Sequence, residues 1–237
     1  MIIIKSIAII FFNLIDKLIH QKKILYFLKK EKISIHTWID VGSHRGLYTD
    51  LIKKNFGVKK AYLFEPQKNI FKFIKNKYKN DKSVFLYNLA ISNSKIKKIF
   101  YINKHDLTSS LTKINKKNFY LRIKAKIFGG KIEDMVTTEY VVNSISLSNF
   151  IKKKKIKKIN LIKIDTEGHE FEVLQGLKKK INIVENILIE FHNNKIYLNY
   201  NSNNIHKYLI KNNFVLKKKI KFPFTEWEDR IYINKNS

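Results

Sequence analysis

The sequence predicts an α/β fold with a mostly parallel central sheet, helices on both faces, and an antiparallel strand pair near its carboxyl end. From residue 35 onward, short runs rich in β-branched and aromatic residues alternate with longer helical or polar stretches. This alternation is typical of βαβ units. The 237 residues suffice for one such domain with a substantial core. We expect this domain over residues 35–237, preceded by a helical extension over residues 1–34.

The extension is predicted to contain an amphipathic helix with polar side chains on one side and apolar side chains on the other. The polar set is Ser6, Asn13, Asp16, Lys17 and His20, and the apolar set is Ile7, Ile10, Phe11, Leu14, Ile15 and Leu18. The apolar run is too short for a membrane span, and no signal-peptide cleavage site follows it. We expect the helix to pack on the domain, the alternative being shallow binding to a membrane surface.

The elements of the domain follow in chain order. The strands predicted for the main sheet are 37–41, 61–64, 84–89, 161–164 and 187–191. The helices predicted between them are 48–55, 69–79 and 170–180. An insertion over about 97–145 is predicted to contain β segments at 97–103 and 136–145, separated by a 104–134 loop long enough to be a lid. The runs 214–221 and 229–233, joined through Pro223, predict the closing antiparallel pair.

Positive charge exceeds negative charge by 29, from 48 Lys and Arg against 19 Asp and Glu. Such a surplus is typical of proteins that bind nucleic acid or anionic membranes. Only three of the basic residues are arginines, however, and base and bidentate phosphate recognition favour arginine. The abundant Lys, Ile and Asn are also what an A+T-rich coding sequence gives. We therefore expect no nucleic-acid partner, and contact with an anionic membrane or an acidic substrate stays open.

Cysteine is absent, which excludes disulfides, thiolate zinc sites and thiol nucleophiles. This composition is compatible with a reducing compartment. We expect a cytoplasmic protein, peripheral at the membrane if the amphipathic helix binds there.

Two strand ends predict a cofactor site. The strand 37–41 runs into a turn with Gly42 and Gly46, and the next strand ends at Glu65-Pro66. Ligands of open α/β sheets bind at such strand ends, and an acid there can accept hydrogen bonds from ribose hydroxyls, although a strand-ending Glu is also common as a surface cap. A complete G-x-G-x-x-G or P-loop motif is absent, which disfavours NAD and FAD. An adenosine ligand without pyrophosphate is expected, contacted by Asp40, Gly42, Ser43, Gly46, Tyr48, Glu65, Pro66 and Ala90.

The run Asp165-Thr166-Glu167-Gly168-His169-Glu170 follows a strand predicted to be buried. Buried acids are costly without partners, so a cleft is expected there. This run, with Val173-Leu174 and Gly176, resembles the hallmark of FkbM-type methyltransferases. The glycine turn and three further segments keep the family's order: Phe64-Glu65-Pro66, Ser109-Ser110-Leu111 and Ile189-Glu190-Phe191-His192. The resemblance covers about 35–193 and departs at Leu147-Ser148-Asn149, where the family usually has a Leu-Asp pair.

The resemblance implies a Rossmann-like class I methyltransferase with S-adenosyl-L-methionine (SAM) as cofactor. It implies methyl transfer to an oxygen, typically a hydroxyl of a sugar, glycan or related metabolite. The protein must mainly align the reactants, and a base would help because a neutral alcohol is a poor nucleophile. The candidate catalytic residues are Asp165, Glu167, Glu190 and His192. Asp165 and His192 rank first, because an acid can orient a basic imidazole; alternatively, His192 bonds to backbone at its strand end.

Other interpretations remain. Asp165, Glu190 and His192 are alternative ligands for a magnesium or manganese ion, but no spacing rule supports this, and the expected site holds no metal. A nucleic-acid methyltransferase fits the net charge but not the motifs, since an Asp/Asn-Pro-Pro-Tyr/Phe sequence is absent. The third alternative is a non-catalytic SAM-fold protein that acts through its basic surface.

Overall fold

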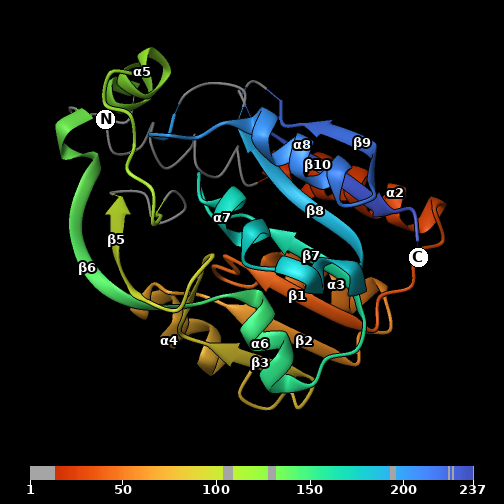
Figure 1. The fold of residues 1–237 in the computed structure, drawn as a ribbon. Coiled ribbons are helices and arrows are strands. Elements are labelled where there is room, and N and C mark those ends of the chain that lie inside the picture. The colour runs from red at the N-terminus through yellow and green to blue at the C-terminus, as the bar shows by residue number, and fades with distance from the viewer. Residues whose placement is uncertain are drawn as a thin grey trace.

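The centre of the molecule is a seven-stranded sheet with the order β3-β2-β1-β7-β8-β10-β9 (Figure 1). This computed structural model describes residues 14–103, 109–127, 132–192, 196–223, 225 and 227–236. Five strands run parallel: β1 (Thr37–Val41), β2 (Lys60–Phe64), β3 (Val84–Tyr87), β7 (Ile159–Ile164) and β8 (Val184–His192). Two more pair antiparallel at one edge: β9 (Phe214–Lys221) and β10 (Trp227–Asn234). The predicted mostly parallel sheet and its closing pair are confirmed.

Helices cover both faces of the sheet, because its central strands are apolar on both sides. Every residue of β7 is buried, the pattern of a strand enclosed between two helical layers. On one face Ile162 and Ile164 pack with α6 (Leu147–Lys154), α7 (Glu170–Gln175) and α8 (Ser202–Lys211). On the other face Leu161 packs with α2 (Gln21–Lys30), α3 (Leu47–Asn55) and α4 (Lys68–Lys77).

The helices differ from prediction in three places. The single helix predicted over 170–180 is wrong: α7 ends at Gln175, and a 3-10 turn, η4 (Lys178–Ile183), follows. At Gly176, a Cβ would lie 2.3 Å from the carbonyl oxygen of Ser92, so this backbone approach requires glycine where the helix stops. Helices α6 and α8 were not predicted, although the side chains of Ser146 and Asn201 cap them, which is a recognisable start signal.

The insertion forms a second, three-stranded sheet with the order β4-β6-β5. Its strands are β4 (Ala90–Ile91), β5 (Lys97–Asn103) and β6 (Val136–Ile145), so both predicted β segments are confirmed. Helix α5 (Phe119–Ile127) lies inside the segment predicted as a loop, at the far end of β5 and β6 (Figure 1). Leu121 and Ala125 of α5 pack with Ile196 and Tyr197. The insertion thus folds back over the segment that follows β8.

The amino-terminal helix follows the predicted division of its sides only in part, because Lys17 of the polar set is exposed and Ile15 of the apolar set is buried. In η1 (Asp16–His20), His20 is fully buried, whereas Leu14 and Leu18 are 50% and 46% exposed. The cause is a buried partner, because His20 Nε2 lies 2.9 Å from Asp229 Oδ2 of β10. Ser6, Ile7, Ile10, Phe11 and Asn13 of the predicted helix lie outside the described residues. Because Leu14 and Leu18 are exposed, contact of this helix with a membrane surface stays a prediction. No described helix is long and apolar enough to cross a membrane.

Replacing His20 with alanine is expected to destabilise the fold, because it removes the imidazole from the buried Asp229 carboxylate. Breaking such a buried pair costs about 3 kcal/mol. The measurement is urea denaturation followed by circular dichroism. Leu18→Ala, on the exposed side of the same helix, is the matched control and should change stability by less than about 0.5 kcal/mol. Equal losses in the two variants would contradict the inward orientation of His20.

Candidate active site

A cavity opens at the carboxyl ends of β1, β2 and β7. Its walls come from these strand ends, from the segment around β4 and from the insertion. The lining includes Val41, Gly42, Phe64, Glu65, Pro66, Leu89, Ala90, Phe100, Ser109, Leu111, Asp165, Thr166 and Glu167. The enclosed part of the cavity has a volume of about 100 Å³, and the cavity opens to solvent at its mouth. It lies where open α/β sheets bind their ligands.

Gly42 allows the ends of β1 and β7 to meet at this cavity. Its φ is +79°, and a Cβ there would lie 1.8 Å from the carbonyl oxygen of Asp165. The backbone N–H groups of Gly42 and Ser43 both donate to the carbonyl oxygen of Phe64 at 3.1 Å. The glycine turn is therefore tied to β2 on one side and lies against β7 on the other.

The Glu65 carboxylate is held at the cavity wall by backbone donors. It accepts hydrogen bonds from the N–H of His44 at 2.9 Å and from the N–H of Gln67 at 2.7 Å. The side chain of Asn88 donates to the Glu65 carbonyl oxygen at 2.8 Å. Each carboxylate oxygen can accept more than one hydrogen bond, so Glu65 keeps the capacity to accept from a ligand.

The structure divides the predicted cofactor residues into two groups. Gly42, Glu65, Pro66 and Ala90 line the cavity, whereas Asp40, Ser43, Gly46 and Tyr48 are not among its lining residues. Asp40 and Tyr48 face the α2–α3 side of the sheet: Asp40 accepts a hydrogen bond from Thr49, and Tyr48 donates to Asp229. The carbonyl oxygen of Gly46 accepts a hydrogen bond from the Tyr78 hydroxyl. The buried hydroxyl of Ser43 has no hydrogen-bond partner within the described part of the chain. These four residues stabilise the glycine turn from outside the cavity.

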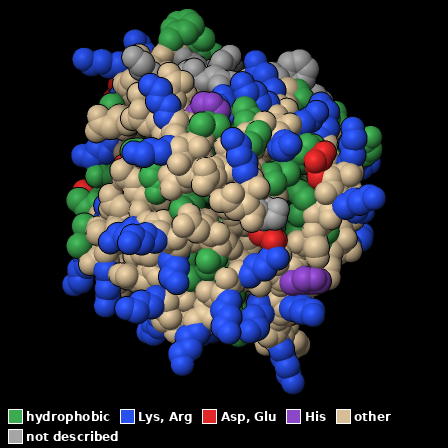
Figure 2. Space-filling view, turned by 45° about the vertical axis from the view of Figure 1, so that its right-hand side comes forward, with side chains coloured by type: hydrophobic (Ala, Val, Ile, Leu, Met, Phe, Trp, Pro, Cys, Tyr) green, Lys and Arg blue, Asp and Glu red, His purple; other side chains and the backbone are tan. Residues whose placement is uncertain are grey.

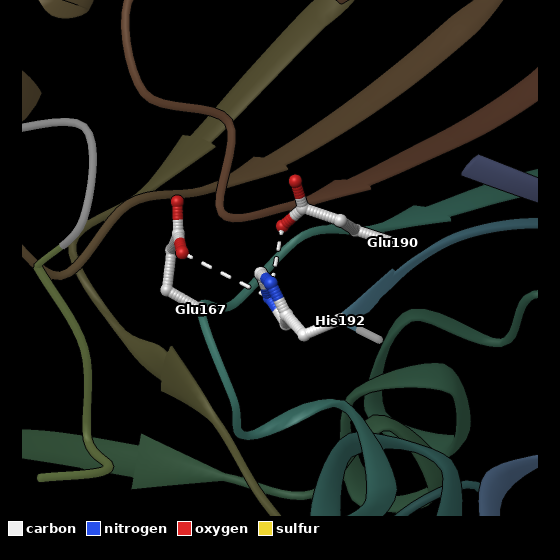
Figure 3. Close-up of side chains that lie close together, drawn as sticks. All are labelled: Glu167, Glu190 and His192. Atoms are coloured by element: carbon white, nitrogen blue, oxygen red, sulfur yellow. Dashed lines mark ion pairs between the residues drawn. The ribbon is translucent and has the colours of Figure 1, made fainter. Parts of the chain in front are cut away.

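Three of the predicted catalytic residues converge on one point (Figure 3). Glu190 and His192 come from β8, and Glu167 comes from the loop after β7. The Nε2 atom of His192 lies 3.4 Å from Glu190 Oε2 and 3.9 Å from Glu167 Oε2. We call Glu167, Glu190 and His192 the acid–imidazole cluster. Of its members, Glu167 lines the cavity, so the cluster adjoins the cofactor site.

Asp165 has a different partner from the one expected. Its Oδ2 atom lies 2.5 Å from the ammonium of Lys163, which is buried in β7. Burial raises the pKa of the Asp165 carboxyl, but Lys163 outweighs burial and leaves that pKa below its ordinary value. Asp165 is therefore an ionised, ion-paired carboxylate. The carboxylates nearest to the His192 ring nitrogen belong to Glu190 and Glu167 instead, and Glu167 replaces Asp165 among the predicted metal candidates.

The ionised form is unfavourable for both glutamates of the cluster. Burial, reinforced by Glu190, raises the pKa of Glu167 well above its ordinary value. Burial, reinforced by Asp165, does the same to the pKa of Glu190. The Tyr197 hydroxyl donates to Glu167 Oε2. Without a further positive charge, these two side chains retain protons more strongly than exposed glutamates do.

The loop that carries Glu167 is held in its conformation by hydrogen bonds to the Glu170 side chain. Glu170 Oε1 accepts hydrogen bonds from the N–H of Thr166 at 2.9 Å and from the N–H of Gly168 at 3.1 Å. Gly168 has a φ of +94°, and a Cβ there would lie 2.4 Å from the Tyr197 ring. Sequence reasoning missed Tyr197 and the structural role of Lys163. The isolated lysine in the apolar run Ile162-Lys163-Ile164 was the available signal for a buried ion pair.

Asp40, which precedes the glycine turn, is expected to make the stability of the fold depend on pH. Burial raises its pKa from 3.8 to about 6, so between these values the folded state binds more protons than the unfolded state. The stability that the protonated Asp40 side chain contributes at low pH is then lost as pH rises through about 6. Relative to Asp40→Asn, the wild type should lose about 2 kcal/mol of unfolding free energy between pH 4.5 and 7.5. Urea titrations at both pH values measure this, and a constant difference would contradict it.

A family model described as the methyltransferase FkbM domain matches residues 40–216 of the chain. The chain belongs to the FkbM methyltransferase family. The matched segment contains the glycine turn, the Asp165–Glu170 loop and β8, so the cavity and the acid–imidazole cluster lie within the family domain. The matched domain is thus a methyltransferase domain by family, and SAM is its expected cofactor.

Two solved structures share the fold. One is the FkbM methyltransferase of Methylobacillus flagellatus, 13% identical with a TM-score of 0.52, covering 84% of this chain and 43% of that one. The other is a Rossmann-superfamily protein of Streptococcus agalactiae, 12% identical with a TM-score of 0.50, covering 91% of this chain and 68% of that one. At these identities the likeness shows the fold alone, which is the Rossmann-like fold expected from the sequence.

A curated relative adds a local similarity. The hexuronic acid methyltransferase AglP of Haloferax volcanii is 34% identical over 59 residues, which are 24% of this chain and 25% of that protein. The matched segment thus spans about a quarter of the relative's length.

Proposed function

We propose that this FkbM-family protein transfers the methyl group of SAM to a hydroxyl oxygen of a sugar or glycan. The observation that carries this proposal is the position of the acid–imidazole cluster, which adjoins the cavity through Glu167. A hydroxyl needs a proton acceptor as it attacks a carbon, and the cluster supplies carboxylate and imidazole groups for that purpose. The local similarity to AglP, a methyltransferase named for hexuronic acid, supports a carbohydrate acceptor.

The cavity residues fit a bound nucleoside with a cationic sulfur. When bound, SAM supplies an electrophilic methyl group on a sulfonium. Glu65, at the end of β2, would accept hydrogen bonds from the ribose hydroxyls. Ala90 and Leu89 give the cavity an apolar wall beside it. Asp165, at the end of β7, is held ionised by Lys163 and supplies negative charge on the side of the cavity next to the cluster.

The charge of the cluster favours a hydroxyl over a carboxylate as the methyl acceptor. A carboxylate acceptor would lie beside Glu167 and Glu190, whose pKa values already show the cost of crowded, buried negative charge. A neutral hydroxyl carries no such penalty and can donate its hydrogen bond to Glu167. In such a transfer the hydroxyl oxygen would gain the methyl group, the sulfur would keep the electron pair of the broken S–CH₃ bond, and the acid–imidazole cluster would accept the hydroxyl proton.

The surface around the site suits an anionic glycan. Figure 2 shows lysine and arginine side chains spread over one face, with acidic side chains at only a few places. On the insertion, the ammonium of Lys113 lies 5.3 Å from the centre of the Tyr101 ring. The ammonium of Lys68, at the start of α4, lies 5.3 Å from the centre of the Tyr140 ring on β6. Such pairs combine an aromatic surface for a sugar ring with a positive charge for its acidic groups. The net charge of +29 would concentrate anionic acceptors at the surface.

Replacing Glu65 with alanine is expected to weaken SAM binding at least about tenfold, because two ribose hydrogen bonds to a charged group are lost. Isothermal titration calorimetry with SAM measures this directly. Glu139→Gln, an exposed change on β6, is the control and should leave the affinity unchanged. Unaltered SAM affinity in Glu65→Ala would remove the ribose role of this residue.

His192→Ala is expected to lower methyl transfer by about 10²- to 10⁴-fold, the range for a lost proton-transfer group, while SAM affinity stays within about threefold. Transfer of labelled methyl from SAM to glycan and RNA fractions measures the activity. The exposed His36→Ala is the matched control and should keep full transfer. Label that enters RNA alone would refute the sugar assignment.

A further inference from the structure

Glu167, Glu190 and His192 present three donor atoms that lie within 4.8 Å of one another. They are two carboxylate oxygens and the Nε2 atom of an imidazole, and Figure 3 shows all three side chains directed toward the same space. They come from two neighbouring elements, β8 and the loop after β7, which the parallel pairing of β7 and β8 holds side by side. The spacing suits donors that share one small central ion.

Two of the three donor atoms, on Glu190 and His192, are buried without hydrogen bonds, whereas Glu167 Oε2 accepts one from the Tyr197 hydroxyl. Among the described residues, Glu190 Oε2 and both ring nitrogens of His192 have no hydrogen-bond partner. The side chains of Glu190 and His192 are only 9% and 3% exposed. Buried polar atoms of folded proteins are nearly always satisfied. Glu190 Oε2 and His192 Nε2, which face each other at 3.4 Å, therefore indicate that a partner belongs between them.

The cluster also lacks positive charge. The ammonium of Lys163 is engaged by Asp165 at 2.5 Å, and Glu170 is satisfied by backbone N–H groups. In the described part of the chain, the ion pairs of Glu167 and Glu190 are with His192. Two buried carboxylates thus share one imidazole, and a dication would neutralise them and satisfy the unbonded donors together.

We propose that Glu167, Glu190 and His192 bind one divalent cation of the Mn²⁺ type. Two carboxylate oxygens favour Mg²⁺ or Mn²⁺, and the imidazole nitrogen shifts the preference toward Mn²⁺. Three protein ligands leave positions of the ion open to the acceptor. The cation polarises the acceptor hydroxyl and lowers its pKa, and the second oxygen of Glu167 remains to receive the proton. This catalytic role rests on the proposed function, whereas binding of the ion does not.

The test is titration of Mn²⁺ into the full chain after chelator treatment and buffer exchange, with free Mn²⁺ followed by electron paramagnetic resonance. One bound ion per chain is expected. Glu190→Gln and His192→Ala should each weaken binding at least about tenfold. The controls are Glu172→Gln and His36→Ala, which change the same residue types outside the cluster and should bind as the wild type does. Circular dichroism confirms that each variant is folded.

Two outcomes would overturn the proposal: no Mn²⁺ binding by the folded wild type, or equal binding by wild type and both cluster variants. Calorimetric titration of SAM into the same chelated samples separates this proposal from the proposed function. If SAM binds and methyl transfer proceeds without the cation, the catalytic role of the cation is wrong and the proposed function stands. If SAM does not bind, the proposed function fails whatever the Mn²⁺ result.

Discussion

The site is organised by one buried lysine in the middle of an apolar sheet. Lys163 lies in β7, next to Asp40 across the β1–β7 pairing and 2.5 Å from Asp165. Burial lowers the pKa of its ammonium, but Asp165 and Asp40 outweigh burial and raise that pKa above its ordinary value. A permanent buried cation therefore determines which acids at this edge of the sheet are ionised.

The consequences extend across the α2–α3 face of the sheet. Lys163 stabilises the Asp165 carboxylate, so the two glutamates of the acid–imidazole cluster are left with His192. Farther along the same edge, Asp229 of β10 pairs with Glu190 in register and takes His20 as its partner. That contact holds His20, one residue of the predicted polar side, inside the protein. Helix orientation, the ionised acid at the cavity and the strained cluster are thus parts of one buried electrostatic arrangement.

The sequence predicted the sheet and cavity well because their signals are local. Each signal is read from a short stretch of sequence: the apolar strands, the glycines at 42 and 46, and the acids directly after β2 and β7. Parallel pairing then brings the strand ends together. The inward turn of His20 could not be predicted, since its partner Asp229 is 209 residues away. Asp40 and Tyr48 were expected at the cofactor because they flank the turn, but the direction of their side chains depends on the packing of α2 and α3.

The central claim is that the cavity holds the nucleoside while the acid–imidazole cluster receives the acceptor. A crystal structure of the complex with S-adenosylhomocysteine tests it most directly. The account predicts the ribose hydroxyls within hydrogen-bond distance of Glu65 and the sulfur atom on the Asp165–Glu167 side, facing the cluster. A nucleoside bound outside this cavity, or a sulfur atom directed away from Glu167, would contradict it.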